Sequence, residues 1–268
     1  MSTAVTRSGG TRSAPDLAGQ VALITGAAHG QGRASALALA REGVNIVALD
    51  VATAEEALER VARLQGRISF FKVGQQLYTA SGPELVRHII DTGAKVFLDL
   101  KLHDIPNTVG AAVRSAVALN IDMLTIHLSG GEAMIRAAVD AAKQKVTILG
   151  VTVLTSQTEE TLGSVGVTEG LEKHVLRLAT LGVNCGVGGL VASPREATML
   201  RKQIPKNIRI VAPGIRPKWA AAGDQKRVAT PREAIEAGAN YLVIGRPIIA
   251  ASDPAAAVDK VLAELESR

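Results

Sequence analysis

The segment "KVFLDLKLHDIPNTV", residues 95–109, begins as an apolar strand and ends in a cluster of charged side chains. Its first residues are typical of a buried strand in a parallel sheet. Asp99 and Lys101 are two residues apart, so a regular strand would point both side chains to the same face. Asp104 follows, and Pro106 ends regular pairing. Two carboxylates flanking an ammonium group would hold the lysine charged and fixed in direction. Such a lysine can stabilise a developing carbanion and then protonate it.

The same alternation of short apolar runs and longer amphipathic segments extends in both directions from this segment. Strands are expected at 45–50, 69–74, 95–101, 123–128, 146–154, 189–193, 208–214 and 241–246. Helical patterns lie between them, for example at 53–64, 82–93, 131–143 and 231–240, and 253–268 would form the closing helix. Eight strand–helix repeats predict an α/β fold, a TIM (β/α)₈ barrel, over residues 44–268.

Composition narrows the classes of function. Hydrophobic residues make up 47% of the 268 residues and aromatic residues only 2%, as suits parallel strands covered by helices. The net charge of +5 comes from dispersed lysines and arginines, which favours a small anionic substrate over a nucleic acid. The single cysteine, Cys185, allows no internal disulfide and fits a reducing, cytoplasmic location. No apolar run is long enough to predict a membrane span.

Ionisable and polar residues recur where the expected strands end, which is where barrel enzymes place their reacting groups. In chain order these residues are Asp50, Lys72, Asp99, Lys101, Asp104, His127, Thr155, Arg216 and Arg246. The alternative interpretation is an ion-pair network that only closes the barrel rim. His103 and His127 are interpreted as structural residues of that rim, and the histidines form no metal-ligand cluster in the sequence.

The last two strands predict a phosphate site. Gly214 and Arg216 follow the seventh strand, and Gly245 and Arg246 follow the eighth. Loops at these positions commonly bind phosphate in barrels, because glycine lets the backbone approach and arginine supplies paired donors. Gln225, in "GDQKR", is a candidate lid residue over the same phosphate group.

Taken together, these motifs resemble the orotidine 5′-phosphate decarboxylase family throughout residues 44–268. The motifs that carry the resemblance are "IVALD", "FFKVG", "FLDLKLHDIPNTV", "VTVLTS", "APGIRP", "GDQKR" and "YLVIGRP". The pattern D-x-K-x-x-D-I-P-N-T is highly specific, and the other motifs follow in the family's order.

The resemblance implies a role for each matching residue. Asp50 and Lys72 would hold ribose hydroxyls, with Lys72 also part of a Lys-Asp-Lys-Asp catalytic array that includes Asp99, Lys101 and Asp104. Asp104, Ile105 and Thr108 would reach the active site of the second subunit of a homodimer. Thr155 and Ser156 would contact the pyrimidine, and Arg216, Gln225, Gly245 and Arg246 would bind the 5′-phosphate.

The reaction implied is decarboxylation of orotidine 5′-phosphate to uridine 5′-phosphate and CO₂, a step of pyrimidine biosynthesis that needs no metal or organic cofactor. Three residues depart from the family pattern. Leu128 stands where a small residue is usual, Gly188 where an aspartate is common, and Trp219 where something smaller is expected.

The first residues of the chain resemble a different family. Residues 17–50 resemble the first βαβ unit of short-chain dehydrogenases, with the turn T-G-x-x-x-G-x-G formed through Gly26, Gly30 and Gly32. These glycines are the weak candidates for cofactor binding, since a helix N-terminus there could attract a phosphate. We expect a disordered tail over 1–19 and a Rossmann-like βα extension over 20–43.

Two other interpretations remain open for the whole chain. One is an NAD(P)-binding protein of the short-chain dehydrogenase type, and the other is a catalytically impaired chimeric barrel that binds a phosphorylated ligand. The dehydrogenase interpretation is opposed by the absence of a Tyr-x-x-x-Lys pair, because glycines stand four residues after Tyr78 and Tyr241.

Overall fold

The computed structural model describes residues 45–220 and 228–266. Within them, eight parallel strands close into a barrel in the order β1 to β8, and β1 pairs with β8. The strands are β1 (Asn45–Leu49), β2 (Phe70–Gly74), β3 (Lys95–Leu102), β4 (Met123–His127), β5 (Thr147–Val151), β6 (Gly189–Val191), β7 (Arg209–Ala212) and β8 (Tyr241–Ile244). The predicted TIM barrel is therefore confirmed.

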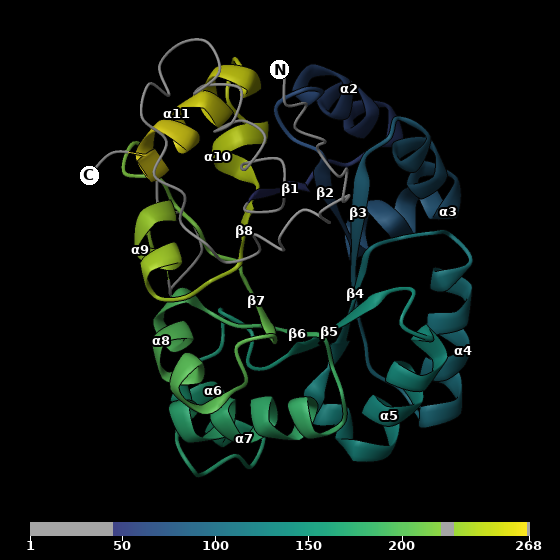
Figure 1. Ribbon diagram of the computed structural model, residues 1–268, viewed down its shortest axis with the longest axis vertical. Coiled ribbons are helices and arrows are strands. Elements are labelled where there is room, and N and C mark those ends of the chain that lie inside the picture. The colour runs from purple at the N-terminus through teal and green to yellow at the C-terminus, as the bar shows by residue number, and fades with distance from the viewer. Residues whose placement is uncertain (1–44, 221–227, 267–268) are drawn as a thin grey trace, which may run out of the picture.

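Helices surround the barrel on all sides (Figure 1). They are α2 (Ala54–Leu64), α3 (Gln75–Asp91), α4 (Pro106–Val117), α5 (Gly131–Ala142), α6 (Glu159–Ser164), α7 (Leu171–Asn184), α8 (Pro194–Gln203), α9 (Pro231–Glu236), α10 (Arg246–Ile249) and α11 (Pro254–Glu266), with a 3₁₀ turn η1 (Leu128–Gly130). Thr53, Thr158, Ser193 and Thr230 cap four of them through side-chain oxygens that accept backbone N–H bonds. α3 is interrupted at Gly82, whose φ of 65° precedes Pro83.

Alternating strand residues build two separate cores. The inner core fills the barrel with Ile46, Ala48, Phe70, Phe97, Met123, Leu149, Val211 and Val243. The outer core lies between the strands and the helices and contains the intervening strand residues, such as Val47, Phe71 and Leu98. Because the period of a strand is two, each inner-core residue fixes which later residues of its strand face the barrel interior.

The observed strands begin within one residue of the expected positions, but several end earlier. β5 ends at Val151 rather than 154, and β7 ends at Ala212 rather than 214. The residues that follow leave the regular strand, with a bend at Val153 and a φ of 77° at Gly214, and several of them line the cavity described below. The sequence does not mark these strand ends, because residues beyond them such as Val153 and Leu154 are as apolar as the strands themselves.

The three departures from the family pattern lie away from that cavity. Leu128 is fully buried and occupies space left by Gly150 and Gly182, where an added Cβ would lie 2.5 and 2.7 Å from its side chain. A Cβ at Gly188 would lie 2.8 Å from the Thr147 side chain. Trp219 is partly exposed, and the Lys260 Nζ lies 5.7 Å from its ring centroid.

The N-terminal expectations fall outside the described residues. These are the tail over 1–19, the Rossmann-like unit over 20–43 and the candidate glycines Gly26, Gly30 and Gly32. Among the helices that the structure describes, none is both long enough and apolar enough to cross a membrane.

Candidate active site

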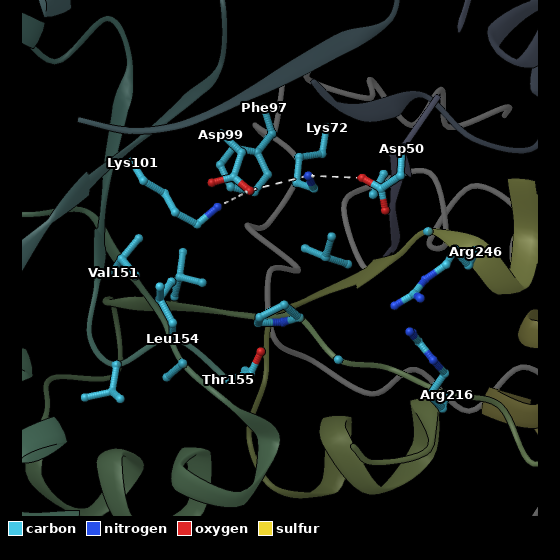
Figure 2. Close-up of a pocket in the computed structure, with 18 residues that line it drawn as sticks. Asp50, Lys72, Phe97, Asp99, Lys101, Val151, Leu154, Thr155, Arg216 and Arg246 are labelled. Atoms are coloured by element: carbon cyan, nitrogen blue, oxygen red, sulfur yellow. Dashed lines mark hydrogen bonds and ion pairs between the residues drawn. The ribbon is translucent and has the colours of Figure 1, made fainter. Parts of the chain in front are cut away.

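A cavity of about 270 Å³ lies at the carboxyl ends of the strands (Figure 2). Both charged and apolar residues line it. The lining residues are Ala48, Asp50, Lys72, Phe97, Asp99, Lys101, Val151, Val153, Leu154, Thr155, Val191, Ala192, Pro213, Gly214, Arg216, Val243, Gly245 and Arg246. Strands and loops from all around the barrel except β4 contribute to this list.

Four charged residues form a continuous array on one side of the cavity. Lys101 Nζ donates to Asp99 Oδ2 at 2.8 Å, and Lys72 Nζ lies 3.4 Å from the same oxygen. Lys72 Nζ also lies 3.6 Å from Asp50 Oδ1. Three of these side chains continue the inward parity of their strands, since Asp50 lies two residues after Ala48, Lys72 two after Phe70, and Asp99 two after Phe97. The chain thus places alternating charges in the order Lys101, Asp99, Lys72, Asp50.

Asp99 is the centre of this array and is 8% exposed. Burial alone would raise the pKa of its carboxyl group, but the ammonium groups of Lys72 and Lys101 more than compensate, so its pKa lies below the ordinary value. Asp99 therefore remains ionised at neutral pH, and its charge holds both lysine side chains in place.

Lys101 does not continue the strand as its spacing predicts. Leu98 pairs with Leu124 and Leu102 with Ile126, so β3 advances four residues while β4 advances two. Lys101 lies inside this bulge with φ of 50°, a left-handed conformation that is uncommon for a residue other than glycine. A conformation of this kind costs about 1–3 kcal/mol and persists only where surrounding contacts enforce it.

Two arginines face the array from the opposite side of the cavity. The guanidinium groups of Arg216 and Arg246 extend toward each other from the loop after β7 and from the first residue of α10 (Figure 2). Gly245 lies between β8 and Arg246, and an added Cβ there would lie 2.5 Å from Asp50 Oδ2. The glycine therefore lets the arginine loop approach the array closely, and the paired guanidiniums are suited to a doubly charged anion.

The remaining residues predicted to contact a ligand are Thr155, Ser156 and Gln225. Thr155 lines the cavity, whereas Ser156 is exposed and does not line it. Gln225 lies outside the described residues.

The residues after β3 point away from this cavity. Asp104, Ile105 and Thr108 are all exposed, and Ile105 is 66% exposed despite being a large apolar residue. The Asp104 carboxylate accepts a hydrogen bond from the Ile105 N–H at 2.6 Å, and none of the three residues lines the cavity. The expectation that Asp99 and Asp104 flank Lys101 is thus met within this chain by Asp99 alone.

Sequence reasoning missed the apolar part of the lining and one buried hydroxyl. Phe97, Val151, Val153 and Val243 line the cavity, but in the sequence they look like ordinary core residues. Thr125 is 0% exposed, and its Oγ1 donates to Asp99 Oδ1 at 2.9 Å. Its inward parity after Met123 is the signal that could have identified it.

Two histidines lie close to Lys101. The His103 and His127 rings are 5.6 Å apart, and burial, followed by the nearby His103 and Lys101, lowers the pKa of His127 below its ordinary value. A neutral His127 fits the predicted structural role at the rim. Within residues 45–220 and 228–266, no group of three or more His, Cys, Asp or Glu side chains is arranged to hold a metal ion.

The chain is similar to known proteins over the whole barrel. Residues 45–261 match the model of the "Orotidine 5'-phosphate decarboxylase / HUMPS family". The orotidine 5′-phosphate decarboxylase of Opitutus terrae is 50% identical over 225 residues, which cover 83% of this chain and 98% of the relative. The enzyme of the same name from Geobacter sulfurreducens is 47% identical over 232 residues, covering 84% of this chain and 97% of the relative.

A solved structure gives the same result for the fold. The crystal structure of orotidine 5′-phosphate decarboxylase from Lactobacillus acidophilus has a TM-score of 0.74 and 33% sequence identity, covering 84% of this chain and 100% of that one. The family match begins at the first residue that the structure describes, so residues 1–44 lie outside it. The chain belongs to the orotidine 5′-phosphate decarboxylase / HUMPS family.

Proposed function

We propose that this chain decarboxylates orotidine 5′-phosphate to uridine 5′-phosphate and CO₂, with Lys101 as the proton donor. The observation that carries the proposal is the charge array of Lys101, Asp99, Lys72 and Asp50 facing Arg216 and Arg246 across one cavity. An ion-pair network that only closed the rim would need neither the cavity nor the arginine pair.

The two sides of the cavity suit the two ends of the substrate. Arg216 and Arg246, with the Gly245 backbone and Gln225, bind the 5′-phosphate. Asp50 and Lys72 hold the ribose hydroxyls between them, because they lie at the end of the array nearest Gly245. Thr155 and the neighbouring Ser156 contact the pyrimidine, whose faces pack against the apolar lining.

The array then acts on the bond between C6 and the carboxylate. This bond breaks with its electron pair remaining on C6, and CO₂ leaves. The Lys101 ammonium group, fixed by Asp99, opposes the negative charge that develops on C6 and transfers a proton to it. A C–H bond replaces the C–C bond, and the resulting amine takes a proton back from water. Asp99 lies beside the departing carboxylate, so repulsion between the two anions is relieved as CO₂ leaves.

The phosphate contributes to the rate although it does not react. Its binding to the arginines orients the base over Lys101, which converts remote binding energy into positioning at C6. The reaction needs no metal or organic cofactor, because the lysine supplies both the charge and the proton.

A second copy of the chain completes the site in this proposal. Asp104, Ile105 and Thr108 are exposed and follow the array by only a few residues. An exposed isoleucine at the start of α4 is suited to an interface, and a two-fold dimer would carry these residues from each copy to the other's cavity.

Residues 1–44 are dispensable for catalysis in the same proposal, since the family match begins at residue 45 and the two relatives align over 97–98% of their own length with 83–84% of this chain. The sequence resemblance of residues 17–50 to a dehydrogenase unit lies largely within this segment. The single cysteine favours a reducing compartment such as the cytoplasm for this reaction.

The test is an assay of the purified full-length protein with orotidine 5′-phosphate, before and after treatment with a chelator. Equal amounts of uridine 5′-phosphate and CO₂, unaffected by the chelator, are expected. Calorimetric titration with NADH tests the dehydrogenase interpretation. No turnover together with saturable NADH binding would replace the proposal with a nucleotide-binding role.

A further inference from the structure

The peptide unit between Leu100 and Lys101 lies where the barrel ladder offers it no partner strand. Pairing of β3 with β2 extends only to Asp99, which pairs with Gly74. Pairing with β4 is interrupted between Leu98 and Leu102. The C=O of Leu100 and the N–H of Lys101 belong to this one peptide unit, so both need partners other than backbone.

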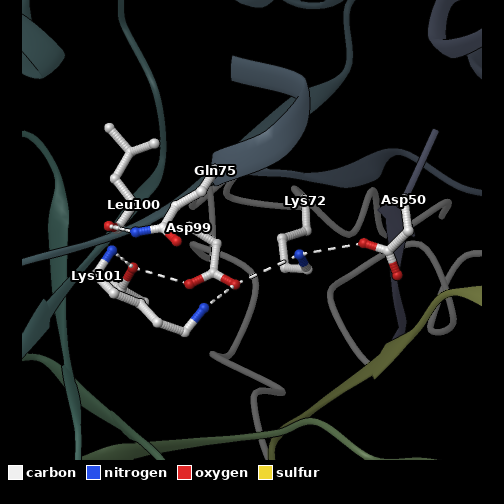
Figure 3. A network of polar contacts seen from close by, with 7 residues as sticks. Asp50, Lys72, Gln75, Asp99, Leu100 and Lys101 are labelled. Carbon is white, nitrogen blue, oxygen red and sulfur yellow. Dashed lines mark hydrogen bonds and ion pairs between the residues drawn. The ribbon is translucent and has the colours of Figure 1, made fainter. Parts of the chain in front are cut away.

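Side chains from the two neighbouring segments supply those partners. Gln75 Nε2, at the start of α3, donates to the Leu100 carbonyl at 2.8 Å (Figure 3). On the other side, the Lys101 N–H donates to Thr125 Oγ1 of β4 at 2.8 Å. The two bonds hold opposite ends of the same peptide unit, and together they fix the rotation that gives Lys101 its φ of 50°.

Thr125 has a second contact that joins the backbone of Lys101 to the charge array. Its hydroxyl accepts from the Lys101 N–H and donates to Asp99 Oδ1 at 2.9 Å. A hydroxyl has one donor and two acceptor lone pairs, so both bonds can form at once. With Oδ1 occupied in this way, Oδ2 is left for Lys101 Nζ at 2.8 Å and Lys72 Nζ at 3.4 Å.

Thr125 is also protected from solvent, which makes its contacts hard to replace. It is 0% exposed, so water does not take over when the hydroxyl is removed. Gln75 is exposed, so water can substitute for its amide.

We propose that Thr125 and Gln75 are positioning residues that clamp the Leu100–Lys101 peptide unit in its left-handed conformation, and that Thr125 is the main contributor because it orients the Asp99 carboxylate as well. This inference rests on the proposed decarboxylase function, in which the position of Lys101 Nζ determines the rate. Misplacing a reacting group by about 1 Å can cost about 100-fold in rate, which sets the scale of the effect.

The test compares Thr125→Val, which removes the hydroxyl and keeps the shape, with Thr125→Ser, which keeps the hydroxyl. The matched control is Thr152→Val, because Thr152 is also buried and its Oγ1 donates to the Val191 carbonyl at 3.1 Å, away from Lys101. We expect Thr125→Val to lower kcat by about 10- to 100-fold with KM changed less than about threefold. Thr125→Ser and Thr152→Val should stay within about threefold of the wild type in kcat.

The pH profile supplies a readout that a loss of packing would not change. Thr125 is one of the groups that lower the pKa of Asp99, together with Lys72 and Lys101, against the opposing effect of burial. Without the hydroxyl, Asp99 takes up a proton at higher pH, so the acid limb of kcat should move to higher pH in Thr125→Val and return in Thr125→Ser. Equal losses in the valine and serine variants, or an unmoved acid limb, would overturn the proposal.

Gln75→Leu extends the test to an exposed position, where folding is not endangered. A fall in kcat of about threefold is expected, with no change for Gln76→Leu, an exposed neighbour. Equal kcat values for these two variants would remove Gln75 from the clamp.

A crystal structure of Thr125→Val decides the inference independently of activity. Lys101 should leave the left-handed region, or its Nζ should lose the contact with Asp99. If both are retained, the clamp is wrong. If instead the wild type does not turn over orotidine 5′-phosphate, the proposed function fails, and this structural comparison still tests the clamp.

Discussion

The rim formed by β1 to β3 and the segment that follows β3 lie only a few residues apart, yet they are built in different ways. Asp50, Lys72, Asp99 and Lys101 contact one another within the chain and line the cavity. Asp104 and its neighbours point to the surrounding solvent. The charge array is thus held together by contacts within the chain, whereas the exposed residues before and at the start of α4 act, in the proposed function, on a second copy of the chain.

The first prediction concerns the charge array, whose residues contact one another within one chain. Asp99→Asn removes the anion that both lysines contact, so Lys72 and Lys101 repel each other and Nζ of Lys101 is no longer fixed. The expected loss in kcat/KM for orotidine 5′-phosphate is about 1,000-fold, measured by steady-state kinetics. Asp140→Asn, at an exposed position on α5, is the control and should retain wild-type kinetics. An Asp99→Asn enzyme within tenfold of wild type would show that the array is structural.

The second prediction concerns Asp104, which is proposed to act at the cavity of a second copy of the chain. Asp104→Asn should lower kcat by about 100-fold without lowering the melting temperature, because Asp104 is exposed. Mixing this variant with Lys101→Ala should restore activity to about a quarter of the wild type, since half of the redistributed dimers carry one intact site of two.

Subunit exchange supplies the check on this complementation. Recovery should require time for the dimers to redistribute and should be absent when the subunits are crosslinked before mixing. If the mixture stays as inactive as its components, Asp104 does not act across an interface.

The third prediction concerns packing in the outer core, which stabilises the strands that carry the charge array but takes no part in its chemistry. Gly150→Ala would place a Cβ 2.5 Å from the Leu128 side chain in the outer core, behind the strands. The overpacking should lower the free energy of unfolding by about 1–3 kcal/mol in urea titrations, with kcat within about threefold of wild type. Adding Leu128→Ala to this variant should relieve the clash. A large fall in kcat at unchanged stability would show that the outer core acts on the site directly.

The fourth prediction concerns the pH dependence of stability near Lys101. Burial, His103 and Lys101 depress the pKa of His127 in the folded state. As pH falls below the ordinary histidine value of about 6.5, the unfolded chain takes up a proton that folded His127 resists, so stability decreases with decreasing pH. His127→Gln should make the free energy of unfolding fall less steeply between about pH 7 and 5. An unchanged slope would mean that His127 is protonated equally in both states.

Several site residues could be predicted from the sequence, because local patterns mark them. The inward parity of Asp50, Lys72 and Asp99 follows from apolar residues two positions earlier in each strand, and this local pattern is visible without a structure. The arginines after β7 and β8 are recognisable because each lies within two residues of a glycine at the end of an apolar run.

The remaining features depend on contacts between distant segments. The left-handed conformation of Lys101 is enforced by Thr125 and Gln75, each about 25 residues away in sequence. No local pattern marks a lysine in a strand for this conformation, and parity alone predicts a regular strand there. The accommodation of Leu128 by Gly150 and Gly182 is likewise set by packing between elements that only the fold brings together.

Lys101 is proposed as the proton donor of a decarboxylase. Measuring CO₂ release from orotidine 5′-phosphate by the wild type, Lys101→Ala and Lys95→Ala tests this role. Lys95 is an exposed lysine at the opposite end of the same strand. We expect turnover by the wild type and Lys95→Ala at similar rates, and a loss of at least about 10,000-fold in Lys101→Ala, because charge stabilisation and proton transfer disappear together. Turnover by Lys101→Ala at a rate close to that of the wild type would contradict it.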